Sequence, residues 1–243
     1  MKHSNLIPFG CVIGLVAGSA VFAYAPPVLA DGVTAAETYA IVRGGKLYDK
    51  WYTLSGGGRP KGTHKAWPKS NTKKKGATTH HCKSCHGWDY MGKDGAYGSG
   101  SYKTGIPGIG AYAGANIAKI TAVLGNAIHE LAGKMPEKDM GALALFVSKG
   151  QVDMRKYIDY GTKKPMGDAN KGGAYYASVC SNCHGRDGKK PKDMKSFGKQ
   201  MGNPWEVMHK ILNGHPGEDM PAMRVVGPQM AADTMTYMMT LPK

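Results

Sequence analysis

Cys82-Lys83-Ser84-Cys85-His86 occurs a second time in the chain as Cys180-Ser181-Asn182-Cys183-His184. Both stretches place a histidine directly after the second cysteine of a C-x-x-C pair. In an exported protein this pattern is typical of covalent haem attachment, in which two thiols add to the porphyrin and the adjacent histidine reaches the iron. We therefore predict two covalently bound haem c groups. The attachment residues are Cys82, Cys85, Cys180 and Cys183, and the iron-binding histidines are His86 and His184.

Three other uses of a C-x-x-C pair explain these stretches less well. The two pairs of a four-cysteine zinc site usually lie about 15 to 20 residues apart, and here the separation is far longer. A disulfide or a thioredoxin-like redox pair gives neither histidine a role. Only haem attachment uses both cysteines and the histidine of each stretch.

The N-terminus has the composition of a secretory signal peptide. Lys2 supplies a positive start, residues 6–25 form an apolar run without charge, and residues 28–30 read Val-Leu-Ala, which fits a cleavage site. We predict a cleaved signal peptide over residues 1–30 and a periplasmic mature protein. The alternative is an uncleaved membrane anchor, because the apolar run approaches the length that spans a bilayer.

The predicted mature chain has few cysteines and a large positive charge. Cys11 lies inside the signal, so only the four motif cysteines remain, and no thiol is spare for a disulfide or for an iron. Lys and Arg number 32 against 17 Asp and Glu. This excess predicts partner proteins with acidic surfaces and leaves peripheral association with anionic membranes open. Nucleic acid is not an expected partner of an exported protein.

The chain divides into two similar halves of mainly α-helical type. Residues 44–48 (Gly-Gly-Lys-Leu-Tyr) have a counterpart in residues 171–176 (Lys-Gly-Gly-Ala-Tyr-Tyr), and the second motif begins four residues after Tyr176. By this alignment about 30 extra residues separate the opening helix from the motif in the first half. We predict a first domain at 31–152 with a basic insertion at 53–81, a linker at 153–170 and a second domain at 171–243.

Hydrophobic spacing and capping residues predict the helices of both halves. The expected segments are an opening helix at 31–52 and a helix from the N-cap Asn116 that carries Ile117, Ile120, Leu124, Ile128 and Leu131. A further helix is expected with Pro136 as its first residue and an apolar stripe of Met140, Leu143, Ala144 and Val147. The second half is expected to have a helix at 203–213 and a final helix with Ala231, Met235, Met238 and Met239. The glycine-rich run at 92–110 is expected to be irregular. Within it, residues 106–108 could offer a carbonyl to the proximal histidine.

The insertion at 53–81 contains many basic residues and no acidic one. It admits two interpretations, a solvated loop or a docking surface for an acidic partner. Its basic residues are Arg59, Lys61, Lys65, Lys69, Lys73, Lys74 and Lys75.

A sixth iron ligand is expected from the loop before the last helix of each half. In the second half Met220 is the candidate, because it lies in a loop and precedes Pro221; Met223 and His215 are its rivals. In the first half Met135 occupies a similar place, although it could instead be a hydrophobic staple. Its rivals are His129 and, more remotely, His80 and His81. Thioether ligands would raise the reduction potentials of both irons.

Taken together, the chain resembles the tandem two-domain dihaem cytochromes c of bacterial periplasms, with each half similar to a small class I cytochrome c. The resemblance rests on residues 82–87 and 180–185, on Met135-Pro136 and Met220-Pro221, and on the surrounding helices. It implies two helical domains, each wrapped around a covalently attached haem. The basic insertion and the short interval between Met135 and its helix depart from the pattern.

The same resemblance implies an electron carrier without catalytic residues. It implies relay between a dehydrogenase or quinol-oxidising complex and a terminal acceptor such as an oxidase. The alternative is a haem-bearing electron-transfer subunit of a dehydrogenase complex that oxidises thiosulfate, sulfide, sulfite or an alcohol, with the catalytic centre on another chain.

Overall fold

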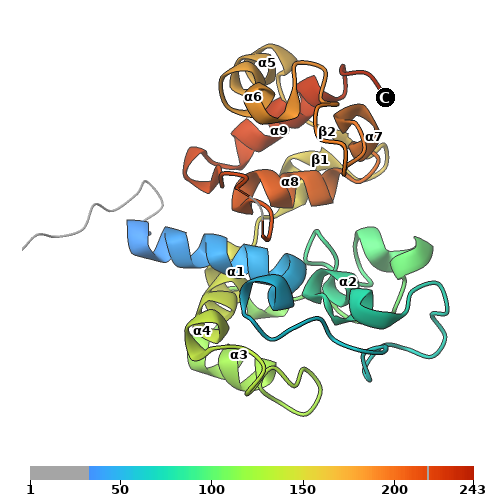
Figure 1. Cartoon of the computed structure of the whole chain (residues 1–243), viewed down its shortest axis with the longest axis vertical. Helices are drawn as coiled ribbons and strands as arrows, with labels where there is room; N and C mark the ends of the chain where they lie inside the picture. Colours follow the sequence, from blue (N-terminus) through green and yellow to red (C-terminus); the bar gives the residue numbers. More distant parts are fainter. Residues whose placement is uncertain (1–32, 218) are drawn as a thin grey trace, which may run out of the picture.

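The computed structural model describes residues 33–217 and 219–243, which form a mainly helical structure (Figure 1). The predicted signal peptide at 1–30, with Cys11, lies outside the described residues. Among the residues that the structure describes, no helix is long and apolar enough to cross a membrane.

The first half (residues 33–152) is built on two crossing helices, α1 and α4. Its elements are α1 (Ala35–Leu54), η1 (Gly76–His80), α2 (Cys82–His86), η2 (Ala96–Gly98), η3 (Gly100–Tyr102), η4 (Gly110–Tyr112), α3 (Ile117–Leu124), α4 (Glu137–Leu145) and the π-helical turn η5 (Phe146–Gly150). A capping box between Thr34 and Glu37 starts α1. At the crossing, a Cβ on Gly44 would overlap the carbonyl oxygen of Ala142, so only glycine permits this approach.

The second half (residues 169–243) repeats this arrangement with α5 and α9. Its elements are α5 (Ala169–Tyr175), the π-helical turn η7 (Tyr176–Cys180), α6 (Ser181–His184), α7 (Phe197–Gln200), α8 (Pro204–Asn213), η8 (Arg224–Val226) and α9 (Pro228–Met238). Gly172 lies where α5 crosses α9, and a Cβ on it would overlap the carbonyl oxygen of Asp233. Gly44 and Gly172 therefore have the same structural role in the two halves.

The segment between the halves is a packed element. It contains the short helix η6 (Met154–Lys156) and an antiparallel hairpin of β1 (Ile158–Asp159) and β2 (Lys164–Pro165). Met154 and Ile158 are each 1% exposed, so this segment contributes to the core. Helix α5 begins before residue 171 because the side chain of Asp168 caps it, accepting from the backbone N–H groups of Asn170 and Lys171.

The two halves pack against each other through α1 and α8, which meet at the centre of Figure 1. His209 on α8 is fully buried, with Nε2 2.9 Å from the carbonyl oxygen of Gly45 and Nδ1 2.8 Å from the hydroxyl of Tyr90. Arg224 donates to the carbonyl oxygen of Gly150 at 3.0 Å. Because these buried polar groups find their partners across the junction, the halves form one packed unit.

Most predicted helices are present, with one clear error. Met140, Leu143, Ala144 and Val147 are buried on α4 and its continuation, and α8 ends at Asn213, as the sequence predicts. The helix capped by Asn116, however, ends at Leu124 and does not continue through Ile128 and Leu131. Gly125 caps its C-terminus, and the Asn126 side chain then accepts from the N–H of Ile128, starting a separate turn. The prediction was wrong because apolar residues happen to continue at helical spacing beyond the end of the helix.

Candidate haem sites

The first motif forms one helical turn, α2, that ends at a glycine. Cys82 and Cys85 are three residues apart on this turn, so their thiols lie on one face. Gly87 follows with φ +81°, a backbone conformation that residues with a side chain rarely adopt. The Tyr48 hydroxyl donates to the Gly87 carbonyl at 2.6 Å, so α1 holds the end of the motif in place.

The second motif is held by the same contact. Gly185 follows His184 with φ +79°, and the Tyr176 hydroxyl donates to its carbonyl at 2.7 Å. Tyr48 and Tyr176 are therefore structurally equivalent, in agreement with the sequence alignment of the two halves. This equivalence places the extra residues of the first half between α1 and α2.

A cavity of about 700 Å³ lies beside the first motif, and its lining is largely apolar. Cys82, Cys85 and His86 form part of its wall. Apolar and aromatic side chains from α1, α3, α4 and η5 supply much of the rest, among them Tyr48, Trp51, Ile120, Leu124, Leu143 and Val147. Such a volume with two thiols and an imidazole at its wall fits a haem group attached through the motif.

The orientation of His86 is fixed by a backbone carbonyl. Its Nδ1 lies 2.7 Å from the carbonyl oxygen of Pro107, within the segment that the sequence analysis singles out for this contact. A carbonyl can only accept, so Nδ1 carries the proton and Nε2 keeps the lone pair that binds a metal. Burial lowers the pKa of His86, which favours the neutral form required of a ligand.

His184 in the second half has a different environment. Its ring packs on Phe197 with centroids 4.6 Å apart, and within the described part of the chain its buried Nδ1 has no hydrogen-bond partner. The hydrogen bond from Phe197 N to Gly188 O matches that from Ile109 N to Tyr90 O. In this alignment of the two halves, Lys195 occupies the position of Pro107, the residue whose carbonyl oxygen accepts from His86 in the first half.

Burial raises the pKa of three motif cysteines, Cys82, Cys85 and Cys180, and so favours their protonated thiol form. Burial raises the pKa of Cys82 to about 12 and that of Cys180 to about 11. Thiols used for zinc binding or for thiol–disulfide exchange have lowered pKa values. The electrostatic environment of both motifs therefore disfavours these alternatives.

The candidate sixth ligands of the first half differ in their access to the cavity. His129 lines the cavity, as do His80 and His81. Met135 is 5% exposed and is not among the lining residues. It directly precedes Pro136, the N-cap of α4, and so occupies the first position of a hydrophobic staple, whose second position is the buried Met140.

In the second half, Met220 and Met223 are both half-buried against the hydrophobic core. They lie in the segment between α8 and α9, together with the half-buried His215. The backbone N–H of Met223 donates to the Ile211 carbonyl at 2.9 Å, which ties this loop to α8. Because all three side chains lie half-buried in the same loop, the assignment of Met220 as the sixth ligand stays a prediction.

The insertion at 53–81 folds back over the cavity. Pro60, Lys61, His64 and Ala66 line it, a role that the composition of the insertion did not reveal. The indole of the buried Trp67 donates to the Asn71 carbonyl at 3.1 Å, and the Asn71 amide donates to the carbonyl oxygens of Ser101 and Lys103. The insertion is therefore ordered, although most of its basic side chains are exposed.

A buried ion pair supports the first motif. Lys83, inside the motif, contacts Asp49 on α1 at 2.5 Å and lies over the Trp88 ring at 4.1 Å. Burial alone would raise the pKa of Asp49, but the nearby ammonium groups of Lys83 and Lys210 hold it below its ordinary value. Charge pattern alone could not reveal this pair, because its members are 34 positions apart.

Comparison with known proteins identifies the second half. The family model described as cytochrome c oxidase, cbb3-type, subunit III matches residues 167–238. No curated protein and no solved structure matches the chain. The family match includes Cys180–His184 and does not extend to the first motif. Residues 167–238 are thus a cytochrome c domain with covalently bound haem c, which implies electron transfer.

Proposed function

We propose that the chain is an exported dihaem cytochrome c that relays single electrons between partner proteins. The observation that carries this proposal is that both motifs are held in the same way. In each half a tyrosine of the opening helix donates to the carbonyl of the glycine after C-x-x-C-H. Since the second half is a cytochrome c domain, the shared arrangement supports the same role for the first.

The residues around the first motif fit a haem group. Two thiols and a correctly protonated imidazole lie at the wall of a large apolar cavity. The cysteines would fix the macrocycle, and the Pro107 carbonyl would keep the His86 ring aimed at the iron. When bound, haem supplies one-electron transfer. The apolar walls exclude water, which limits the reorganisation of the surroundings when the charge of the site changes.

The exposed basic residues of the insertion favour a protein partner with an acidic surface. Arg59, Lys61, Lys65, Lys69, Lys73 and Lys75 are all exposed. The whole chain has a formal net charge of +15. Long-range attraction of this kind raises association rates and falls with ionic strength. Export is inferred from the composition of residues 1–30 and from the oxidising compartment that haem attachment accompanies.

The proposal is tested by counting haem groups on the denatured chain by mass spectrometry. The wild-type chain should carry two, and the pairs C82A/C85A and C180A/C183A should each carry one. S181A changes the second motif without touching an attachment residue and should retain two. A wild-type chain with one haem, or a C82A/C85A variant that loses none, would exclude the dihaem proposal.

A further inference from the structure

Two imidazoles face the same cavity in the first half. The rings of His86 and His129 have centroids 6.2 Å apart, and their planes lie within 21° of parallel. Both residues line the cavity beside the first motif. His86 belongs to the motif, whereas His129 comes from the turn between α3 and α4.

This separation suits two ligands on opposite sides of one metal ion. A metal–imidazole bond is about 2 Å long, and the ring centre lies about 1 Å behind the nitrogen, so the two centroids should be roughly 6 Å apart. Aromatic rings that pack directly on each other have centroids about 4.5 to 7 Å apart, so the distance admits a metal ion between the rings without requiring one. The support comes from the distance together with the hydrogen bonds that orient both rings.

Both rings are oriented by the same type of contact. His129 Nδ1 lies 3.0 Å from the carbonyl oxygen of Val123, as His86 Nδ1 lies beside that of Pro107. Asn126 Oδ1 is a second acceptor at 3.3 Å from His129 Nδ1. Acceptors on Nδ1 place the proton there and leave Nε2 with the lone pair. A carbonyl on the far nitrogen is the usual support of a metal-binding histidine.

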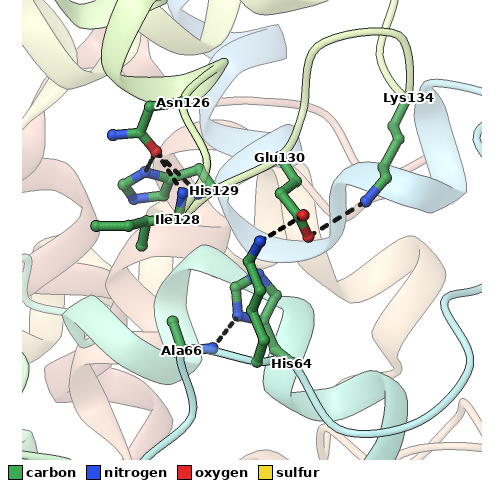
Figure 2. Close-up of polar contacts among 8 residues, drawn as sticks. His64, Ala66, Asn126, Ile128, His129, Glu130 and Lys134 are labelled. Atoms are coloured by element: carbon green, nitrogen blue, oxygen red, sulfur yellow. Dashed lines mark hydrogen bonds and ion pairs between the residues drawn. The ribbon is translucent and has the colours of Figure 1, made fainter.

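The turn that carries His129 is held at both ends (Figure 2). Asn126 Oδ1 accepts from the backbone N–H of His129 at 3.0 Å. Glu130, with φ +54°, pairs with Lys65 of the insertion at 2.5 Å and lies 3.7 Å from Lys134. The insertion and the turn therefore fix the position of the imidazole together.

The other histidines at this cavity are engaged differently. The rings of His64 and His80 pack against each other with centroids 4.8 Å apart. His81 Nε2 lies 2.8 Å from the Tyr52 hydroxyl. Among the described histidines, only His129 lies beside His86 with its ring close to parallel.

With Met220 taken as the ligand of the second half, the internal repeat points to the same residue. Gly44 contacts Ala142 and Gly172 contacts Asp233, and each contacted residue lies five positions after the start of its helix, α4 or α9. With the helices in this register, His129 and Met220 each precede the helix start by eight positions. Met135 corresponds instead to Val226, which is 52% exposed.

We propose that His129 is the sixth ligand of the first iron, so that this site has two imidazole ligands while the second has His184 and Met220. This inference rests on the proposed function, since it needs a haem at the first motif. A second imidazole lowers the reduction potential relative to a thioether. A haem held by two imidazoles at the first motif would have the lower potential of the two, so electron transfer from the first half to the second would be energetically favoured.

The test compares H129A, H129M and M135L as holo-proteins by absorption spectroscopy. H129A should keep the methionine-to-ferric band of the second site and open one ferrous haem to carbon monoxide. H129M should add a second methionine band. M135L, which keeps the volume of a core side chain, should change neither the band nor carbon monoxide binding. Loss of methionine-band intensity in M135L, with H129A closed to carbon monoxide, would overturn the inference.

Two controls separate this inference from the proposed function. Haem content is measured on every sample, and two haems with H129A unchanged would refute the ligand while leaving the dihaem proposal intact. One haem on the wild-type chain would refute the dihaem proposal itself. Near-infrared magnetic circular dichroism of the ferric wild-type protein needs no variant: a bis-imidazole band beside an imidazole–thioether band supports His129, and two imidazole–thioether bands contradict it.

Discussion

The two halves share a framework but enclose their motifs differently. Each has crossing helices that meet at a glycine, and each has a tyrosine hydroxyl on the glycine after the motif. The first half adds the folded insertion and a carbonyl on its motif histidine, whereas Cys183 of the second is exposed and His184 has no such contact among the described residues. The comparison shows that the two halves can share their helix crossing and the position of their motif while the contacts around the motif histidine differ.

The largest expected effect comes from the two crossing glycines. G44A and G172A would each push a Cβ into a carbonyl oxygen of the facing helix, and backbone cannot move aside cheaply. We expect each to lower the free energy of unfolding by about 3 kcal/mol, at the upper end for overpacked cores. Urea unfolding of the holo-proteins measures it.

Gly141 supplies the matched control for these substitutions. It lies on α4, and a Cβ there meets nothing within 4 Å. G141A should be neutral or stabilising by up to about 1 kcal/mol, because alanine is the better helix former. Equal losses in G44A and G141A would show that close helix approach is not what the glycine provides.

A pH effect of comparable size is expected at the junction between the halves. Burial lowers the pKa of His209 from 6.5 to about 4, partly offset by Asp49, while Arg224 and Lys83 lower it further. Between pH 6.5 and 4, His209 is protonated in the unfolded chain but not in the folded chain. The free energy of unfolding therefore falls as the pH drops through this range. From pH 7 to pH 5 we expect a loss of about 2 kcal/mol from this group.

H209Q isolates that contribution from the rest of the chain. His81, whose pKa burial also lowers to about 4, titrates in both proteins. The variant should have a shallower dependence of unfolding free energy on pH over this range than the wild type. The same slope in both proteins would mean that His209 does not titrate on unfolding.

Smaller and unequal effects are expected from the two motif tyrosines. Tyr48 is 1% exposed and its hydrogen bond to Gly87 is buried, whereas the contact from Tyr176 to Gly185 is part-buried. Y48F removes a buried hydrogen bond, although the Gly87 carbonyl still accepts from the N–H of Tyr90 at 3.3 Å, and should cost about 1.5 kcal/mol, whereas Y176F should cost about 1 kcal/mol. Thermal unfolding of both variants measures the order of the two losses in stability. A larger loss in Y176F would contradict the expectation that the buried contact of Tyr48 is the stronger of the two.

The smallest effect on stability is expected from the basic insertion. Replacing Lys73, Lys74 and Lys75 by alanine should leave unfolding almost unchanged, apart from the contact of Lys74 with the Tyr102 ring at 4.5 Å. Association with an acidic redox partner at low salt should slow severalfold. A stopped-flow rate with the same salt dependence in variant and wild type would remove the insertion from the docking surface.

The sequence predicts well whatever depends on local pattern. The two motifs, the cap at Asn116 and the buried stripe of α4 follow from neighbouring residues. So does the equivalence of Tyr48 and Tyr176, because the repeat preserves their spacing. The overextended helix after Leu124 shows the limit, since the Asn126 side chain ended a pattern that spacing alone would continue.

Contacts between distant segments could not be predicted in the same way. The pairing of Lys83 with Asp49, the burial of His209 and the folding of the insertion over the cavity each depend on how elements pack in three dimensions. The choice between Met135 and His129 belongs to this class. It depends on how α4 is aligned along α1, and this alignment is known only from the contact between Gly44 and Ala142 in the folded chain.

The central claim is that two equivalent halves hold two irons with different ligands. A potentiometric titration of the purified holo-protein, followed by its absorption spectrum, tests this most directly. We expect two haems and two one-electron steps of unequal potential, with the methionine-to-ferric band lost only in the step of higher potential. One haem per chain, or two steps at the same potential that each remove half of the band, would contradict the account.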